Sequence, residues 1–588
     1  MTFLPIVERE LRVAARKQST FWLRVSAALV GLVIGAGLMI LSRLGAFGAS
    51  VMGDALFGTL TWLALLVALS AGLFFTADCL SEEKREGTLG FLFLTDLRGY
   101  DVVGGKLLAT SLRVTYGLLA VLPILAVTFL LGAVSGAHYW KTALALLNAL
   151  FCSLAAGLMV SALSRDSQRA LGATVLLLLL LVLGGLAADG LYSEVKHRAF
   201  KPLLSLASPG YVFGVAGAWG RNPYWLALGL NQVIGWTMLG VACLVVPHSW
   251  QEKRHRPKVS RLGYWWKYGG ARRRRALRRK LLERNPVQWL ACRERWQANG
   301  IWVLALLVAG LLVGFVVGKA PEEVWNSWGS LSWVLVGLLY LWIASQASRF
   351  YIEARQSGFL ELLLVAPPTV KEVVQGHWRA LLRMFGVPVA LLLLAELAGG
   401  CLAYGAAWGN AGPQEWRHLL AFVTAAASTL GTLASLLALA WFGMWMGMTS
   451  RKASLATLKT LLFVKVIPFL VIYFAAMYVT FLVIILPQIS KMAYGATTVT
   501  TASGSTTVTF GSSAMMPAML SLLMTCLPAA LSVAVGLAFL AWARHRLYSA
   551  FRQQAARDLG AARLGPAPVS APPRPVPPRP ATPPPGGR

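Results

Sequence analysis

The sequence predicts an all-α integral membrane protein with about twelve transmembrane helices, arranged as two parallel repeats of six helices. Of its 588 residues, 57% are hydrophobic and only 13% are charged, whereas soluble proteins carry roughly 25% charged residues. The apolar residues form blocks such as Leu171–Ala188, which approach the roughly 20 residues that a helix needs to cross a bilayer. Such blocks must be helical because an unpaired backbone amide is not tolerated in hydrocarbon.

The N-terminal segment is expected to be retained in the protein. Met1–Arg24 carries Glu8, Glu10 and several basic residues, and the apolar run that follows, Val25–Leu41, is longer than the apolar region of a signal peptide. We therefore expect an amphipathic surface helix followed by an uncleaved first span.

The apolar blocks define twelve predicted spans, six on each side of a charged central region. Those of the first half lie near residues 22–44, 55–79, 107–134, 141–163, 170–190 and 223–246. Those of the second half lie near residues 299–318, 330–348, 380–403, 417–447, 459–486 and 517–543.

The central region is strongly basic. The net charge of the chain is +31, and the stretch His248–Trp296 holds sixteen Lys or Arg against three Glu, centred on Arg272–Arg275. A nucleic-acid patch is one interpretation of such a run. The membrane context favours another, in which the run fixes orientation on the cytoplasmic side and rests on anionic lipid headgroups. We therefore expect lipids, and no nucleic acid, as partners.

Lys and Arg also set the expected orientation. Segments 1–20, 80–106, 164–169, 248–298, 349–379, 449–458 and 544–588 carry Lys or Arg and alternate correctly if all are cytoplasmic. Both termini are then cytoplasmic. Segment 191–222 fits poorly, because it carries Lys196, Arg198 and Lys201 but falls on the opposite side.

The two halves repeat. Adding 271 to the numbering moves Glu82 onto Glu353, Gly87 onto Gly358, Leu89 onto Leu360, Leu92 onto Leu363 and Gly105 onto Gly376. At an offset of 286, Leu163-Ser164-Arg165 matches Thr449-Ser450-Arg451. Six spans is an even number, so the copies have parallel topology about an axis along the membrane normal. The expected domains are residues 1–247, a linker at 248–298, residues 299–547, and a disordered Pro-rich tail at 548–588.

Isolated polar residues suggest little chemistry. The six cysteines are scattered, without the spacing of a disulfide framework or a zinc site, and no metal site is expected. Glu396 lies inside a predicted span and is a candidate functional residue, since intramembrane charges are rarely tolerated without a role. Lys465 also lies in a span, but we expect its side chain to reach the cytoplasmic interface.

The loop after the second span has a mixed composition that solubility alone does not require. Its charged part, Ser81–Glu86, is followed by Gly87, which permits a change of helix direction, and then by Thr88-Leu89-Gly90-Phe91-Leu92-Phe93. Leu89, Leu92 and Phe93 fall on one face of a short helix. We expect that face to lie in the membrane interface or to dock into a groove of another protein. The second half repeats the plan from Glu353 to Leu364.

These two loops resemble the permeases of type-2 ATP-binding-cassette (ABC) exporters, as two fused copies without an ATPase domain. The resemblance implies six spans per half, a short helical or re-entrant segment before the sixth span, and a coupling helix between the second and third spans. That helix would seat in a groove of a separate ABC-type ATPase, which would bind ATP and Mg²⁺. The implied contact residues of the first half are Glu82, Glu83, Lys84, Arg85, Glu86, Gly87, Thr88, Leu89 and Leu92. Those of the second half are Glu353, Arg355, Gly358, Leu360 and Leu363.

The sequence departs from the family pattern in places. Asp96 stands where the family usually has Pro, Ser357-Gly358-Phe359 replaces the usual Glu-Gly-Thr, and His377 replaces the usual Lys. The second loop is therefore expected to bind its ATPase more weakly, or to have a mainly structural role. The resemblance also implies a multi-pass protein of a bacterial-type inner membrane that moves an unidentified substrate, in the outward direction.

No phosphate-binding loop is found in the sequence. From Gly99, the Lys at position 106 comes one residue late for the G-x-x-x-x-G-K-[ST] pattern, and Leu107 replaces the hydroxyl residue that would hold Mg²⁺. The chain is thus expected to be a permease subunit rather than an enzyme. Two alternatives stay open: a secondary transporter or channel without an ATPase, and a membrane scaffold that transports nothing.

Overall fold

The computed structural model consists of helices joined by short turns, with no strand among the residues that it describes. Those residues are 49–94, 98–130, 134–195, 201–217, 223–249, 271–292, 296–317, 322–360, 362, 369–407, 414–450, 452–480 and 515–563. The predicted N-terminal surface helix, the span at 22–44, residues 250–270 and 293–295 of the linker, and the tail beyond residue 563 lie outside this set.

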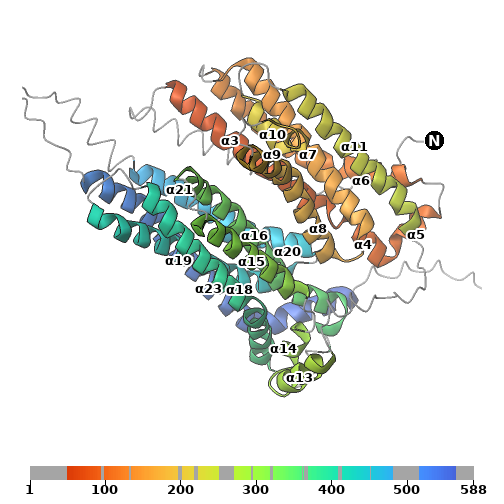
Figure 1. Cartoon of the computed structure of the whole chain (residues 1–588). Coiled ribbons are helices and arrows are strands. Elements are labelled where there is room, and N and C mark those ends of the chain that lie inside the picture. Colours follow the sequence, from red (N-terminus) through yellow and green to blue (C-terminus); the bar gives the residue numbers. More distant parts are fainter. Residues whose placement is uncertain are drawn as a thin grey trace, which may run out of the picture.

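The first half forms one helix bundle, at the upper right of Figure 1. Its helices are α3 (Ala49–Ala71), α4 (Cys79–Glu86), α5 (Thr88–Phe93), α6 (Gly99–Leu130), α7 (Gly136–Leu163), α8 (Ser167–Leu179), α9 (Gly185–Val195), α10 (Pro209–Val215) and α11 (Tyr224–Ser249). Two π-helical segments, η1 (Gly72–Thr76) and η2 (Leu180–Gly184), and the 3₁₀ turn η3 (Ser205–Ala207) complete it.

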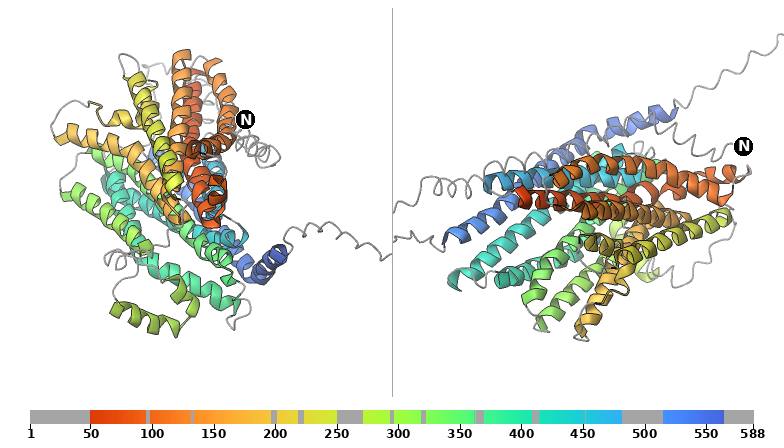
Figure 2. Two further views of the ribbon diagram at one scale, coloured as in Figure 1. Left: turned by 90° about the vertical axis from the view of Figure 1, so that its right-hand side faces the viewer. Right: turned by 90° about the horizontal axis from the view of Figure 1, so that it is seen from above.

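The second half forms a second bundle beside the first. It contains α13 (Ala271–Leu282), α14 (Pro286–Ala291), α15 (Trp296–Val317), α16 (Glu322–Gln356), α18 (Val370–Ala407), α19 (Gln414–Thr449), α20 (Ala453–Leu461), the π-helical segment η4 (Leu462–Val466), α21 (Ile467–Thr480) and α23 (Met515–Arg563). The long helices of the two bundles run roughly along one direction (Figure 2).

Within the described part of the chain, eight helical stretches are long and apolar enough to span a membrane. They are Leu56–Glu86, Gly136–Leu163, Arg169–Gly190, Tyr224–His248, Val370–Ala403, His418–Thr449, Ala453–Ile472 and Cys526–Ala556, and each overlaps a predicted span. The predicted spans at 107–134, 299–318 and 330–348 coincide with helices α6, α15 and α16, which are not among the eight. A total of twelve spans therefore stays a prediction.

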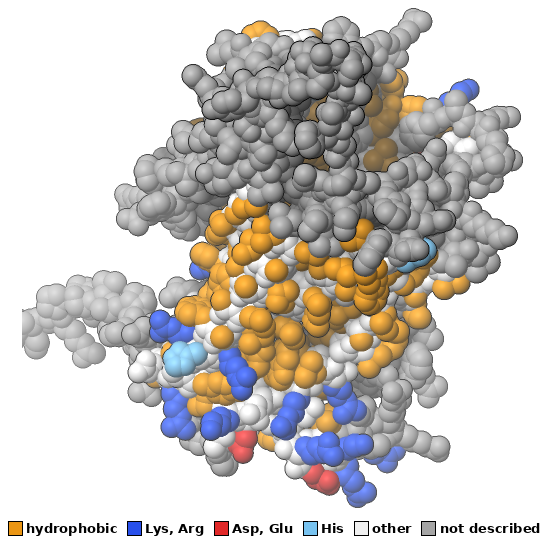
Figure 3. All heavy atoms as spheres, turned by 90° about the vertical axis from the view of Figure 1, so that its left-hand side faces the viewer, with side chains coloured by type: hydrophobic (Ala, Val, Ile, Leu, Met, Phe, Trp, Pro, Cys, Tyr) orange, Lys and Arg blue, Asp and Glu red, His pale blue; other side chains and the backbone are white. Residues whose placement is uncertain are grey.

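The outer surface of the second bundle suits a bilayer. On the face shown in Figure 3, hydrophobic side chains form a continuous field, and Lys and Arg gather along its lower edge. An apolar belt bordered by cations at one end is the surface expected of a protein that crosses a membrane and leaves its basic residues in water.

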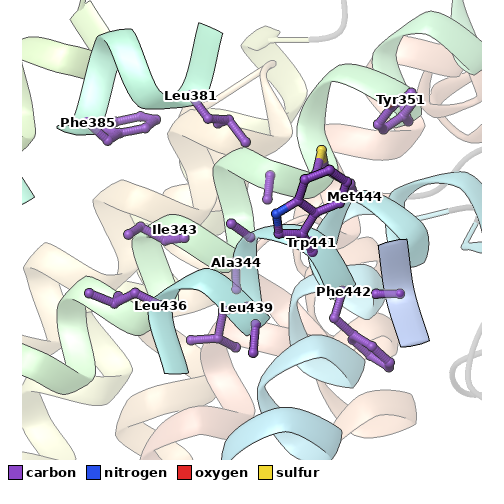
Figure 4. Packing of buried hydrophobic residues seen from close by; sticks show 14 of the residues in the cluster. Ile343, Ala344, Tyr351, Leu381, Phe385, Leu436, Leu439, Trp441, Phe442 and Met444 are labelled. Carbon is purple, nitrogen blue, oxygen red and sulfur yellow. The ribbon is translucent and has the colours of Figure 1, made fainter. Parts of the chain in front are cut away.

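Each bundle has its own core. In the second bundle, Ile343 and Ala344 of α16 pack with Leu436 and Leu439 of α19 and with Leu381 of α18, as Figure 4 shows. The cores of the first bundle are built separately from α3, α6, α7 and α11.

The last helix corrects one predicted boundary. The tail was expected to begin at residue 548, but α23 continues to Arg563. Phe551 and Ala555 are buried in the core of the second bundle, with 3% and 2% of their surface exposed. Residues 548–563 therefore belong to the bundle, because the apolar face of α23 extends past the predicted boundary. The other predicted domain limits stay predictions.

A short helix does precede the sixth predicted span. Within segment 191–222, α10 begins after Ser208, whose hydroxyl accepts a hydrogen bond from the amide of Tyr211 at 3.3 Å, as expected of an N-cap. Asp189 holds the preceding turn by accepting bonds from the amides of Leu203 and Ser205, both at 2.7 Å. The turn before α10 is therefore held to α9 by hydrogen bonds, whereas Lys196 and Arg198 lie outside the described residues.

Candidate functional site

The candidate site consists of two helix breaks, one at Gly87 between α4 and α5, and one at Gly358 just after α16. We call residues 78–94 the first junction and residues 349–362 the second junction. In the first junction α4 ends at Glu86, Gly87 adopts φ 72°, and α5 begins at Thr88. In the second, Gly358 adopts φ 70°. Both torsions lie in the left-handed region, where a residue with a Cβ atom is strained. The predicted change of helix direction is therefore confirmed at Gly87.

The first junction is fixed to α7 through its backbone. The Ser161 hydroxyl accepts hydrogen bonds from the amides of Leu80 at 2.9 Å and Ser81 at 3.0 Å. The Lys84 ammonium donates to the carbonyl oxygen of Ala162. The two bonds to Ser161 satisfy amides in the first turn of α4 that have no partner within the helix, and all three bonds attach α4 to α7.

The charged residues of the first junction pair within the protein. Arg85 binds Asp78 through both guanidinium nitrogens, at 3.1 and 3.3 Å. Glu83 pairs with Lys106 of α6 at 2.7 Å, with only 16% and 12% of these side chains exposed. Most of the charges that were expected to meet a partner protein are therefore already engaged inside the chain.

The apolar face of α5 differs from the expectation. Leu89 is 1% exposed, and Phe93 packs against the same core cluster, so the predicted face is directed into the bundle of the chain itself and does not lie free for another protein. Instead Phe91 is 70% exposed and Leu94 is 75% exposed. The periodicity located a buried face correctly, but that face belongs to a core cluster of this half, to which α4, α6, α7, α8 and α11 also contribute. The side chain of Leu92 lies outside the described set.

The second junction repeats this arrangement. Leu360 is 5% exposed and belongs to the core of the second bundle, whereas Leu362 is 66% exposed. Arg355 donates to the carbonyl oxygen of Ser450 at 3.1 Å, as Lys84 does to that of Ala162. Glu353 pairs with Arg349 one helical turn away. Leu363 lies outside the described residues.

One difference separates the two junctions. The positions that correspond to Glu83 and Lys106 are Ala354 and His377. Ala354 is 4% exposed and His377 is 2% exposed, and the His377 ring stacks on Phe350 with 4.9 Å between centroids. The ion pair under the first junction is thus replaced under the second by the His377 ring, which packs on Phe350 and lies 3.3 Å from the carbonyl oxygen of Ala347.

Glu396 belongs to a polar cluster inside the second bundle. Its carboxylate on α18 accepts a hydrogen bond from Thr432 of α19 at 3.0 Å, and Ser435, one helical turn further along α19, accepts one from Lys465. The ammonium of Lys465 donates to Ser435 at 3.1 Å and lies 4.6 Å from the centroid of the Tyr340 ring. The expectation that Lys465 reaches the cytoplasmic interface stays a prediction.

Two other sequence-based interpretations can be compared with the structure. Residues 99–107 form the first turns of α6, so the partial resemblance to a phosphate loop lies on a helix. All six cysteines are free, and burial raises the pKa of the Cys292 thiol to about 11, which leaves it protonated and unreactive at neutral pH.

Sequence reasoning missed Asp78, Phe91, Leu94 and Lys452. Asp78 and Lys452 are the partners of Arg85 and Glu82. A signal was available for Phe91, since it lies off the face that carries Leu89 and Phe93. None was available for Lys452, which is 370 residues from its partner in the sequence.

A comparison with known protein families found a similarity in the first half. Residues 6–246 match the family model described as ABC-2 family transporter protein. The matched segment contains the first junction and ends within α11. No curated protein and no solved structure matches the chain.

Proposed function

We propose that this protein is the membrane-spanning permease of an ATP-driven ABC transporter, and that a separate ABC-type ATPase docks on its two junctions. The match over residues 6–246 supports the family. The observation that carries the rest is the pair of helix breaks at Gly87 and Gly358, each followed by one buried and one exposed apolar residue at matching positions. The end of the bundles with the junctions is then cytoplasmic.

The docking surface consists of the exposed apolar residues of the junctions. Phe91 and Leu94 in the first, and Leu362 in the second, are each at least 66% exposed. Large apolar side chains exposed at the polar end of a membrane protein commonly mark a protein contact. Glu86 and Thr88, which are also exposed, would form a polar rim around these residues. Leu89 holds α5 in position because its side chain is buried in the core of the first half.

The second half would complete the permease as a fused copy. Its junction has the same torsion at Gly358 and the same pattern at Leu360 and Leu362. It offers fewer exposed large apolar groups among the described residues, and the His377 ring replaces the ion pair beneath it. We therefore propose that the ATPase engages the two junctions unequally, with tighter binding at the first.

Co-purification tests this proposal. The full chain, tagged and extracted in mild detergent, is expected to retain an ABC ATPase from its native membrane and to show ATP hydrolysis only when that subunit is present. Phe91→Asp with Leu94→Asp is expected to reduce ATPase capture at least tenfold, because a contact with several buried apolar groups loses more than about 1.4 kcal/mol. Leu362→Asp is expected to have a smaller effect.

Leu282→Asp is the matched control. Leu282 is 42% exposed on α13, so Leu282→Asp, like Leu362→Asp, adds one negative charge at an exposed apolar position. Capture that falls equally in the control and the junction variants would point to a general loss of folding. Capture that survives Phe91→Asp with Leu94→Asp would contradict docking at the first junction.

One observation favours a second candidate function, transport driven by an ion gradient. Glu396 and Lys465 form a charged cluster within the span region, and such residues line ion pathways in secondary transporters. Substrate flux into vesicles that contain the chain alone, driven by a pH gradient and abolished by Glu396→Gln, would establish this function and displace the first.

A further inference from the structure

The two halves meet at the junction end through α20. This helix of the second half packs against η1 and α8 of the first half. Lys452, the residue immediately before α20, forms an ion pair with Glu82 of α4. The pair therefore joins the first half to the second beside the first junction.

The same ion pair also lies close to the second junction. Lys452 is two residues from Ser450, whose carbonyl oxygen accepts the hydrogen bond from Arg355. Glu82 is adjacent to Ser81, whose amide is held by Ser161 of α7. Glu82 is therefore one residue, and Lys452 two residues, from a hydrogen bond of a junction, so a displacement of either junction would also move one member of the ion pair.

The equivalent positions with the two halves exchanged do not form an ion pair of this kind. The offsets of 271 and 286 relate Glu82 to Glu353 and Lys452 to Asp166. The related pair is therefore two acidic residues, which would repel one another. Each has a basic partner in its own half: Arg349 for Glu353, and Arg169 at 3.5 Å for Asp166.

We propose that Glu82 and Lys452 form a one-sided latch, which holds the two halves together at the cytoplasmic end and opens in each transport cycle. This inference rests on the proposed function. The side chains of Lys452 and Glu82 are 48% and 24% exposed, and an ion pair this exposed is weak. It biases the closed arrangement by no more than about fivefold and can be broken by a movement of either junction.

Zero-length cross-linking tests the contact without reference to any ATPase. A water-soluble carbodiimide joins a carboxylate to an adjacent amine as an amide and takes up the elements of water to become a urea. In membranes that contain the full chain, we expect mass spectrometry to find an amide between Glu82 and Lys452. Glu82→Gln removes the carboxylate and Lys452→Arg removes the reactive amine, so neither variant is expected to give this product.

The requirement for opening is tested in the complex with its ATPase. Cross-linked protein is expected to lose most of its ATP turnover, whereas Lys452→Arg, which keeps the charge, retains its turnover under the same treatment. Lys452→Glu is expected to change basal turnover by up to about fivefold. Lys459→Glu, at an exposed position on α20, makes the same charge change away from the contact and is expected to have no effect.

Each outcome decides one of the two proposals. Absence of the 82–452 amide, or full turnover by the cross-linked complex, overturns the latch and leaves the permease assignment untouched. A chain that forms the amide but captures no ATPase overturns the permease assignment and with it the transport cycle in which the latch would open. An equal response to Lys452→Glu and Lys459→Glu would show a general charge effect and contradict the latch.

Discussion

At the residue scale, Gly87 and Gly358 determine where the junction helices point. Both have a φ near 70°, and no atom lies within 4 Å of the position that a Cβ atom would occupy. A substitution there is therefore limited by backbone strain and not by a steric clash. The composition of the loop predicted Gly87 as a break, since a glycine between a charged turn and an apolar turn has few other roles.

The variant Gly87→Ala tests the effect of backbone strain alone, because its added methyl group meets no neighbouring atom. An L-residue in the left-handed region costs about 1–2 kcal/mol, so we expect lower thermal stability in detergent and weaker ATPase capture. Gly104→Ala on α6, which also has open space around it, is the control and is expected to be neutral or stabilising, because alanine favours a helix. Equal losses in both variants would refute the strain argument.

A second residue-scale prediction concerns the pair Glu83 and Lys106. Glu83→Ala and Lys106→His are each expected to destabilise the protein by about 1–3 kcal/mol, because each leaves a largely buried polar group without its main partner. Together they reproduce the Ala354–His377 arrangement of the second half. Thermal unfolding should therefore show the double variant to be less destabilised than the two single effects combined.

The exposed pair Asp166 and Arg169 supplies the comparison. Its side chains are 37% and 54% exposed, and Arg169→Ala is expected to change stability by less than about 1 kcal/mol. Full additivity of Glu83→Ala and Lys106→His would show that the two residues do not act as a pair.

At the element scale, small residues set how closely the helices approach. A Cβ atom on Gly157 of α7 would lie 2.1 Å from the Thr76 hydroxyl and 2.4 Å from the Gly72 carbonyl oxygen of η1. Close approach at small residues is the usual mode of helix packing in membranes, where apolar side chains gain little by leaving lipid. The sequence contains many glycines, and only the packing distinguishes this one.

The repeat provides a matched test of this packing. Gly443 corresponds to Gly157 at the offset of 286, but its Cβ atom would meet the Ala347 methyl group at 3.0 Å. We expect Gly157→Ala to cost more than about 2 kcal/mol and Gly443→Ala less than about 1 kcal/mol, within the range for overpacking. Folded yield and thermal unfolding in detergent measure both. A reversed order would contradict the packing described for α7 and η1.

Sequence periodicity predicted the position of a helix and its buried face, but not the helices that pack against it. It located α5 and its buried face at Leu89, because a 3.6-residue period is set by local geometry. It did not determine that this face is covered by the same half, since that depends on where α7 and α11 lie. Nor does it give the partners of Lys465, Ser435 and Tyr340, which come from other helices.

At the scale of the whole molecule, the bundles are separate in their cores and joined at few elements. The core around Leu439 draws only on the second half, and that around Leu158 only on the first. Between them, α20 contacts η1 and α8. The halves should therefore fold independently, with the linker keeping them at a high effective concentration.

Division of the chain tests this organisation. Residues 1–260 and 261–588, co-expressed with different tags, are expected to fold separately, to associate at high concentration, and to dissociate on dilution in detergent. Size-exclusion chromatography at several concentrations measures the association. Halves that aggregate when expressed singly would show that each core depends on the other half.

The sequence by itself determined that the chain is helical, has helices apolar enough for a membrane and carries two glycine-broken loops, because hydropathy, helical period and glycine torsions are properties of short segments. Only the tertiary structure decided that Phe91 and Leu94 are exposed while Leu89 is covered, and that Glu82 is paired with Lys452. Those contacts join residues far apart in the chain, and no local pattern specifies which distant helix will lie against a given face.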